Sequence, residues 1–127
     1  MTTHPVFDQL NIIVPDVAAA AAFYELLGFT VEPTEPQWMN EHRTVTSPDG
    51  FDIDIDSAAF AKQWGNLDGG VVAGVKFATR AEVDERYAAL VAAGGASVKP
   101  PFDAFWGKRY AVVRDPGGNA IGLMSAE

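Results

Sequence analysis

The sequence predicts an α+β protein made of two tandem βαβββ modules, because one turn-and-strand pattern occurs in it twice. Residues 115–125 (DPGGNAIGLMS) repeat the pattern of residues 47–57 (SPDGFDIDIDS), with the proline, a glycine and the alternating apolar positions aligned. Each copy is a Pro/Gly turn followed by a strand whose side chains alternate between two faces. A segment with helical periodicity precedes each copy, and a strand-like segment precedes each helix.

The first module is expected at residues 5–57 of a single 127-residue domain. Residues 7–15 alternate like a strand, which places Gln9 and Asn11 on the face opposite the apolar side chains. Asp16 is a suitable cap for the alanine-rich helix expected at 17–27, and Gly28 ends that helix. The remaining elements of this module are expected to be a strand at 29–32, a loop at 33–40 and strands at 42–46 and 51–56.

Residues 58–70 are expected to connect the modules, with a short helical turn near 58–64, and the second module spans 71–127. Thr79 and Glu82 have the spacing of a capping box, so a helix is expected to begin there and to end at Gly94. The other elements of this module are expected to be strands at 71–78, 96–99, 106–114 and 119–125, with a loop at 100–104. We expect the strands to form a mixed sheet, with helices on one side and a cup-shaped concave side facing a ligand.

Composition excludes several classes of function. The formal net charge of −8 argues against nucleic-acid binding, which usually needs a basic surface. No apolar run approaches the ~20 residues that cross a bilayer, and the first residues lack the pattern of a signal peptide. The chain has no cysteine, so a disulfide framework or a thiolate metal site is not possible. We therefore expect a cytoplasmic protein without nucleic-acid or membrane partners.

Three segments of the chain form a recognisable set: residues 10–16 (LNIIVPD), 23–29 (FYELLGF) and 114–119 (RDPGGN). Together they resemble the vicinal oxygen chelate (VOC) superfamily, which includes glyoxalase I, extradiol dioxygenases and bleomycin resistance proteins. The resemblance covers essentially the whole chain and implies the glyoxalase/bleomycin resistance fold, usually as a homodimer. It does not identify a reaction, because this superfamily supports many chemistries on one scaffold.

The same resemblance implies where a divalent metal ion would bind. Matched by position, the ligands of the first module fall on Gln9 and Asp54, and those of the second module fall on Gly74 and Gly122. Glycine has no side chain to offer, and Lys76, expected on the same face, would repel a cation. We therefore predict no metal and no other cofactor, with a weakly held divalent ion as the disfavoured alternative.

The strand at residues 51–56 carries Asp52, Asp54 and Asp56 on one face. Like charges this close disfavour one another, so a nearby positive group such as Lys76 or Arg109 is expected. Three readings remain open from the sequence. The carboxylates belong to a compensated polar network, or they lie on a solvent-exposed face, or they contribute to a metal site.

Aromatic residues gather in the segments expected to surround the cup. They are Trp38, Trp64, Phe102, Phe105, Trp106 and Tyr110. Small residues such as Gly122 are expected to leave open volume where a metal would otherwise sit, so a flat molecule would find both space and stacking surface. The alternative for any one tryptophan is packing between modules or subunits. His42 is expected to reach the mouth of the cup, although a lone histidine more often lies on a surface.

We therefore expect metal-independent binding of a small aromatic or amphipathic molecule. The expected ligand-binding residues are Gln9, Asn11, Trp38, His42, Asp54, Trp64, Lys76, Trp106, Tyr110 and Gly122. The alternative is a lyase or isomerase of glyoxalase type, with Asp54 as general base and either Gln9 or a weakly held divalent ion to stabilise an enolate. A dioxygenase-related enzyme is also left open by the resemblance. A third reading is that the cup is filled by the protein's own side chains and the chain serves as a partner subunit.

Overall fold

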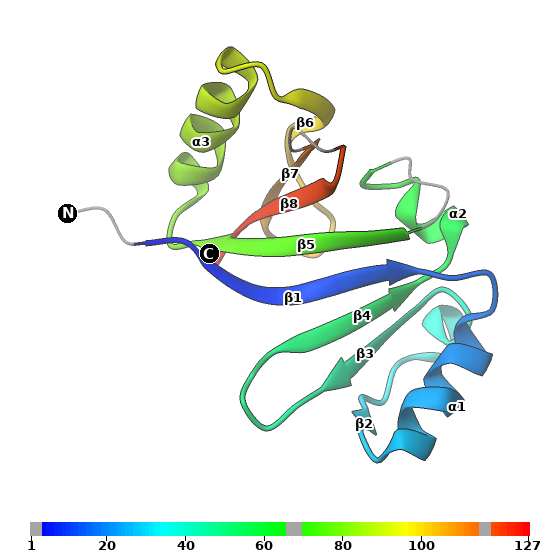
Figure 1. The fold of residues 1–127 in the computed structure, drawn as a ribbon. Helices are drawn as coiled ribbons and strands as arrows, with labels where there is room; N and C mark the ends of the chain where they lie inside the picture. The colour runs from blue at the N-terminus through cyan, green and yellow to red at the C-terminus, as the bar shows by residue number, and fades with distance from the viewer. Residues whose placement is uncertain (1–3, 66–69, 115–117) are drawn as a thin grey trace. The chain divides into compact units, whose positions relative to one another are not determined.

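The computed structural model describes residues 4–65, 70–114 and 118–127. The chain divides into two compact units, Asp8–Val71 and Val72–Glu127, the second of which also includes the residues before Asp8. The elements follow the order βαβββ twice, as Figure 1 shows. The predicted α+β fold of two tandem modules is therefore confirmed.

The first module forms a four-stranded mixed sheet in the order β2-β3-β4-β1. Its first and last strands, β1 and β4, run parallel, and the other neighbours are antiparallel. Its elements are β1 (Val6–Ile13), α1 (Val17–Leu27), β2 (Thr30–Val31), the 3₁₀ turn η1 (Pro36–Trp38), β3 (His42–Thr46) and β4 (Asp52–Asp56), and the short helix α2 (Ala58–Ala61) follows.

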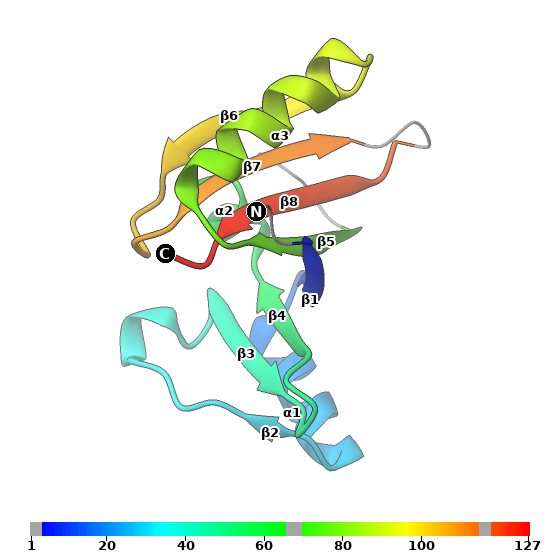
Figure 2. The same ribbon diagram turned by 90° about the vertical axis from the view of Figure 1, so that its left-hand side faces the viewer.

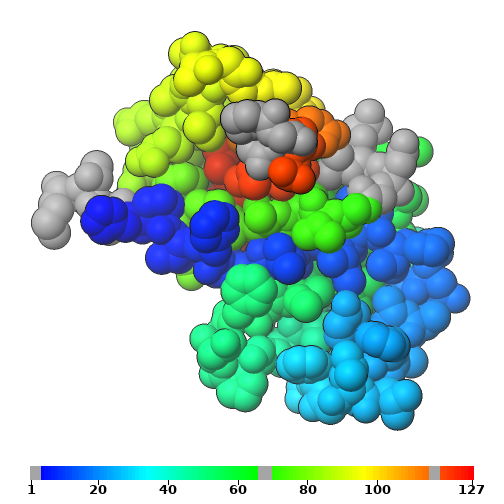
Figure 3. Space-filling model, in the orientation of Figure 1, coloured from blue at the N-terminus to red at the C-terminus, as the bar shows by residue number. Residues whose placement is uncertain are grey.

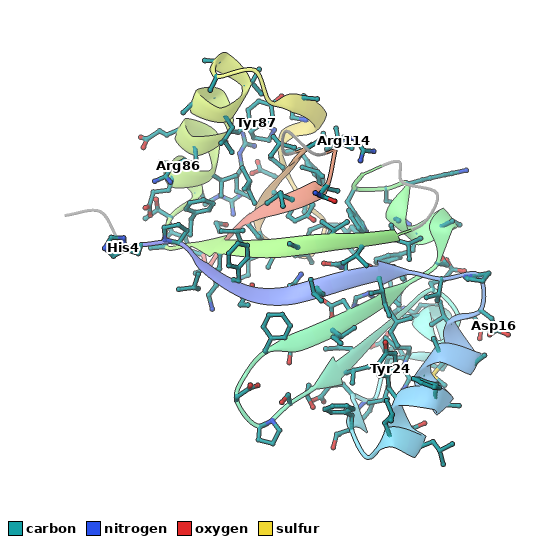
Figure 4. The ribbon with its side chains drawn as sticks, in the orientation of Figure 1. His4, Asp16, Tyr24, Arg86, Tyr87 and Arg114 are labelled. Atoms are coloured by element: carbon teal, nitrogen blue, oxygen red, sulfur yellow. The ribbon has the colours of Figure 1, made fainter. Side chains whose placement is uncertain are left out.

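Helix α1 begins and ends at the residues that the sequence predicts. The Asp16 side chain accepts a hydrogen bond from the backbone N–H of Ala19 at 3.0 Å, and Gly28 closes the helix with a φ of 109°. Figure 4 shows Asp16 at the start of α1 and Tyr24 further along it. The helix packs on one face of the sheet through a core of Val17, Ala21, Val31, Val45 and Ile55. The alternate side chains of β3 and β4, which are polar, therefore lie on the opposite face of the sheet.

The second module repeats this arrangement in the order β5-β8-β7-β6, with β5 and β8 parallel. Its elements are β5 (Gly70–Phe77), α3 (Arg80–Ala92), β6 (Ala96–Asp103), β7 (Arg109–Arg114) and β8 (Ala120–Ser125). Figure 2 shows α3 lying over β7 and β8, and Figure 3 shows the outer side of α3 at the molecular surface. The core between helix and sheet contains Phe77, Val83, Ala111 and Leu123.

The start of α3 confirms the predicted capping box. Thr79 Oγ1 accepts from the Glu82 backbone N–H, and the Glu82 side chain accepts from the Thr79 backbone N–H. Arg109 then ties α3 to the β6–β7 hairpin, because it donates to Asp84 at 2.8 Å and to Asp103 at 3.3 Å.

Two predicted boundaries in the second module are wrong. Strand β6 continues to Asp103, so the loop predicted at 100–104 is mostly strand. Pro100 and Pro101 are tolerated because β6 is an edge strand whose pairing with β7 is irregular on both sides of Lys99. Trp106 lies in a turn, and β7 begins only at Arg109.

Parts of two other predictions, the connection at 66–69 and the turn at 115–117, lie outside the described residues. Among the helices that the structure describes, none has the length and apolar character needed to span a bilayer.

Candidate functional site in the first module

The candidate site is the face of β1, β3 and β4 that points away from α1, here called the polar face. Strand register brings its residues together, because Asp54 pairs with Asn11 on one side and with Thr44 on the other. His42 pairs with Asp56, two residues further along each strand. The polar side chains that form the candidate site on this face are Gln9, Asn11, His42, Thr44, Asp54 and Asp56. Asp52 lies on the same face at the start of β4, four residues from the position that pairs with His42, and is outside this group.

A chain of hydrogen bonds organises the polar face around Asp56. Gln9 Nε2 donates to Asn11 Oδ1 at 3.0 Å, and Asn11 Nδ2 donates to Asp56 Oδ2 at 2.9 Å. The other oxygen of Asp56 lies 2.5 Å from His42 Nδ1. Asp56 is completely buried, so both of its oxygens rely on these partners.

The His42 ring is held by stacking as well as by hydrogen bonding. It stacks on Phe60 of α2 with ring centroids 5.1 Å apart, and Trp38 meets Phe60 edge-on at 5.7 Å. The His42 side chain is 32% exposed, whereas that of Asp56 is 0% exposed. Burial acts to lower the pKa of His42, but the hydrogen bond to Asp56 and the charges of Asp56 and Asp54 outweigh it, and the pKa is raised above 6.5. His42 is therefore not an ordinary surface histidine.

Asp54 lies beside this pair in a different environment. Burial raises its pKa to about 6, although the charge of His42 and a hydrogen bond from Thr44 act in the opposite direction. Thr44 Oγ1 donates to Asp54 Oδ1 at 2.9 Å and lies 3.5 Å from His42 Nε2. The hydroxyl of Thr44 thus stands between the carboxylate and the imidazole.

Of the three readings of the acidic strand, the compensated polar network is correct for Asp54 and Asp56. The solvent-exposed reading is wrong for both, since they are 9% and 0% exposed. His42 is a compensating group that the sequence did not suggest, and the candidate Arg109 instead pairs with Asp84 and Asp103.

Thr44 and Phe60 were not among the predicted site residues, and Asp56 was predicted only as part of the acidic strand. The alternation of His42 and Thr44 along β3 was the available signal for Thr44, and the alternation of aspartates along β4 was the signal for Asp56. No sequence signal pointed to Phe60, because its contact with His42 depends on where α2 packs in the folded chain.

In the second module the aromatic residues pack mainly against one another. Tyr110 contacts Trp106, with ring centroids 5.2 Å apart, and Phe102, at 6.2 Å. Phe105 meets Trp106 edge-on at 5.1 Å. The Trp106 Nε1–H donates to Met124 Sδ at 3.3 Å.

The space beside Gly122 is not open, which corrects the expectation from sequence. A Cβ atom added at Gly122 would clash with the hydroxyl oxygen of Tyr110. Tyr110 therefore fills the volume in which a metal-binding side chain at position 122 would lie.

The other residues predicted to bind a ligand, two tryptophans and Lys76, differ in their surroundings. Trp64 follows α2 in a turn and is only 3% exposed, while Trp38 is partly exposed in η1. Lys76 pairs with Met124 in register, and Gly74 pairs with Gly122 two positions earlier, so both lie on the face that carries Gly122.

A metal ion of the kind that the resemblance implies does not fit these residues. Gly74 and Gly122 supply no donor atom, and Tyr110 fills the space beside Gly122. In the first module Asn11, rather than Gln9, is opposite Asp54, and its amide already serves Asp56 and Gln9. Within residues 4–65, 70–114 and 118–127, no three histidine, cysteine or carboxylate side chains come together as a metal would require.

One pocket of the first module lies on the other side of the sheet. It has a volume of about 200 Å³ and is open to solvent beside the β3–β4 turn. Its lining residues are Phe29, Val45, Thr46, Ser47, Asp49, Phe51 and Ile53. Val45 and Ile53 belong to the face that packs on α1, so this pocket is separate from the polar face.

Comparison with known proteins identifies the scaffold. The model of the Glyoxalase/Bleomycin resistance protein/Dioxygenase superfamily matches residues 6–123. No curated protein matches the sequence of the chain.

Solved structures with the same fold carry several names. A Legionella pneumophila protein named NAD-dependent benzaldehyde dehydrogenase has a TM-score of 0.74 at 13% identity, over 94% of this chain and 98% of its own. Methylmalonyl-CoA epimerase from Mycobacterium tuberculosis has a TM-score of 0.65 at 19% identity, over 95% and 87%. The Mn(II)-bound glyoxalase from Novosphingobium aromaticivorans has a TM-score of 0.66 at 16% identity, over 94% of this chain but 38% of its own. At these identities the likeness shows the fold alone.

Proposed function

Since this chain belongs to the Glyoxalase/Bleomycin resistance protein/Dioxygenase superfamily, we propose that it binds a small aromatic or amphipathic molecule on its polar face without a metal ion. The observation that carries the proposal is the pair formed by His42 and Asp54, two polar groups joined through Thr44 and backed by a buried network. Small-molecule sites combine such fixed polar groups with flat apolar surface. Here Trp38, which is partly exposed, and the exposed part of the His42 ring supply that surface, while Phe60 is buried behind them.

The polar groups favour a ligand that can both donate and accept hydrogen bonds. An ionised Asp54 accepts only, whereas a protonated His42 donates only. An anionic group would be repelled by Asp54 and Asp56, in a protein whose formal net charge is −8. A neutral or cationic compound with one flat face therefore suits the site best.

Binding is tested by adding 2-hydroxyacetophenone, a neutral aromatic α-hydroxy ketone, to ¹⁵N-labelled protein and following amide shifts by NMR. The expected shifts centre on His42, Thr44 and Asp54. Asp54→Asn should weaken binding by about tenfold, because a hydrogen bond to a charged group is worth roughly 1.5 kcal/mol or more. Asp52→Asn is the matched control on the same strand and face and should leave affinity unchanged. Shifts that map elsewhere, or equal losses in the two variants, would contradict the proposal.

A second candidate function is proton transfer by a lyase or isomerase with Asp54 as general base. The observation that favours it is the pKa of Asp54, which burial raises to about 6, close to the range in which a base works best at neutral pH. Binding without turnover of 2-hydroxyacetophenone and related ketones would favour the first function over the second.

A further inference from the structure

We propose that the pocket beside the β3–β4 turn, on the α1 side of the first module, binds a small organic cation, namely an aromatic ring with a protonated amine on a short arm. The ring lies on the apolar floor of the pocket, and the ammonium group lies beside Asp49. This site is on the opposite side of the sheet from the polar face, so the inference does not depend on the function proposed there.

The floor of the pocket is apolar because of strand alternation and register. Val45 of β3 and Ile53 of β4 are opposite each other in the antiparallel ladder, and both side chains point to the face that packs on α1. Phe51, two residues before Ile53, lines the same pocket. These three side chains give the end of the β3–β4 hairpin an apolar surface on this face.

Phe29 supplies a second aromatic side chain. Gly28 ends α1, and the chain continues through Phe29 into β2, which pairs with the end of β3 that leads into the turn (Figure 1). Phe29 is 44% exposed and Phe51 is 36% exposed, so neither ring is fully covered by the protein itself. Two partly covered rings that line one pocket offer contact surface to a flat ligand.

The volume of the pocket suits one ring with a short substituent. The pocket measures about 200 Å³ and is open to solvent. A closed apolar cavity of about 150 Å³ holds benzene, whereas sites for drug-sized ligands begin at about 300 Å³. A single ring therefore fits, and its arm reaches the open side of the pocket.

Asp49 adds a negative charge to the lining. Its Oδ1 accepts a hydrogen bond from the backbone N–H of Phe51 at 3.1 Å. This bond and one from the Ser47 side chain lower the pKa of Asp49, so the carboxylate is ionised throughout the neutral range. A carboxylate has acceptor sites for several donors, so Asp49 can accept from an ammonium group as well.

The charges near the pocket favour a cation over an anion. Among the described residues that line it, none is basic. Together with burial, the charges of Asp8, Glu32 and Asp49 raise the pKa of Asp52, which indicates a negative potential at this end of β4. Arg43 of β3 donates to the backbone oxygen of Glu32 at 3.1 Å and does not line the pocket. An anionic ligand would be repelled here.

The first test compares 2-phenylethylamine with the neutral 2-phenylethanol at pH 7, in protein with ¹³C-labelled methyl groups. We expect NOEs from the ring protons to the methyl groups of Val45 and Ile53, and none to the methyl group of Thr44 on the opposite face of β3. NOEs to Thr44 alone, or no saturable binding of the amine, would overturn the inference.

The charge preference is tested by the same two probes. The amine should bind about threefold more tightly than the alcohol at low salt, as for an exposed ion pair, and added salt should reduce the difference. Asp49→Asn keeps an acceptor for the Phe51 N–H and should abolish this preference. Glu35→Gln, which removes an exposed charge that does not line the pocket, should retain it. Equal affinities of the two probes for the wild type, or an unchanged preference in Asp49→Asn, would overturn the assignment of a cation.

The aromatic contact is tested by a matched pair of substitutions. Phe29→Ala should weaken binding of both probes by about tenfold, because one ring of the lining is lost. Phe23→Ala removes another exposed ring, one that lies on α1 outside the pocket, and should leave both affinities unchanged. Equal losses in the two variants would contradict binding at this pocket.

A second copy of the chain is the competing occupant of this apolar surface. If the methyl resonances of Val45 and Ile53 shift when the protein alone is diluted, a second chain covers the pocket and the inference fails. Binding of 2-hydroxyacetophenone at the polar face is followed through His42, Thr44 and Asp54, so either proposal can fail while the other stands.

Discussion

At the scale of single residues, two titratable groups on the polar face show how environment sets charge. Asp54 and His42 share the Thr44 hydroxyl but have different partners. Burial dominates at Asp54 and disfavours its ionised form. At His42 the buried Asp56 outweighs the effect of burial and favours the charged form. Both pKa values are therefore raised, for opposite physical reasons.

The raised pKa of Asp54 predicts how stability varies with pH. The folded carboxyl titrates at about 6 and the unfolded one near 3.8, so between these values the folded state binds more protons. Stability then falls as pH rises from 4 to 6, by up to about 3 kcal/mol from this group. His42 adds a further loss as pH rises through its own raised value. In urea unfolding at pH 4, 5, 6 and 7, Asp54→Asn should flatten the acidic part of this slope, and an unchanged slope would contradict the assignment.

Asp56→Asn should be destabilising at pH 7. The substitution removes the charge that pairs with His42 and places an amide between two donors, Asn11 and His42. We expect a loss of roughly 2–4 kcal/mol in the free energy of unfolding, because both partners lose a buried anionic acceptor. The control is Asp52→Asn, for which a change within about 0.5 kcal/mol is expected. Comparable effects of the two substitutions in urea titrations would mean that Asp56 is not the centre of the network.

At the scale of elements, the packing between β7 and β8 depends on the absence of a side chain at position 122. Val112 is opposite Gly122 in the ladder, so Tyr110 reaches Gly122 from the diagonal position on the same face. The hydroxyl and ring atoms of Tyr110 occupy the place of a Cβ. The same glycine that removes a potential metal ligand thus makes room for an aromatic side chain.

Gly122→Ala should therefore destabilise the second module. A methyl group at this position must displace Tyr110, and we expect a cost of about 1–3 kcal/mol, as for other overpacked sites. Thermal unfolding of Gly122→Ala, Tyr110→Phe and the double variant measures this cost. Because the hydroxyl is the nearest atom, the double variant should recover part of the loss. Strict additivity of the two single changes would show that the residues do not compete for space.

At the scale of the whole molecule, the donor atoms available decide which chemistry the scaffold supports. The family scaffold is present over residues 6–123, yet two of the four positions matched to metal ligands are glycines. We expect equilibrium dialysis of the purified protein against Mn²⁺ or Zn²⁺ to give far less than one ion per chain. We also expect neither ion to change the thermal midpoint, since binding to the folded state would raise it. One tightly bound ion per chain, lost in Asp54→Asn, would overturn this prediction.

Homodimer formation is a separate prediction for the whole chain. Light scattering should give twice the chain mass of 13.6 kDa at micromolar concentration. A mass of one chain across the accessible concentrations would contradict it. Exposed apolar side chains on α1, including Leu26 at 89% exposed, make such association physically reasonable, because apolar surface is stabilised by burial.

Local chemistry determined which elements form and where most of them begin. Three features could be predicted because each depends on neighbours only a few residues away. They are the Asp16 cap, the Thr79–Glu82 capping box and the alternation in β4. Proline in β6 misled the prediction, since an edge strand tolerates a missing N–H that a central strand does not.

The sequence by itself determined the two-module fold, the acidic face of β4 and the missing metal ligands at Gly74 and Gly122. Only the tertiary structure decided that His42 compensates Asp56, that Phe60 covers His42 and that Tyr110 fills the space at Gly122. The physical reason is the separation along the sequence of the residues that interact. Turns, caps and alternation are set by contacts within a few residues, whereas His42 and Asp56 are 14 residues apart and become partners through the antiparallel register of β3 and β4.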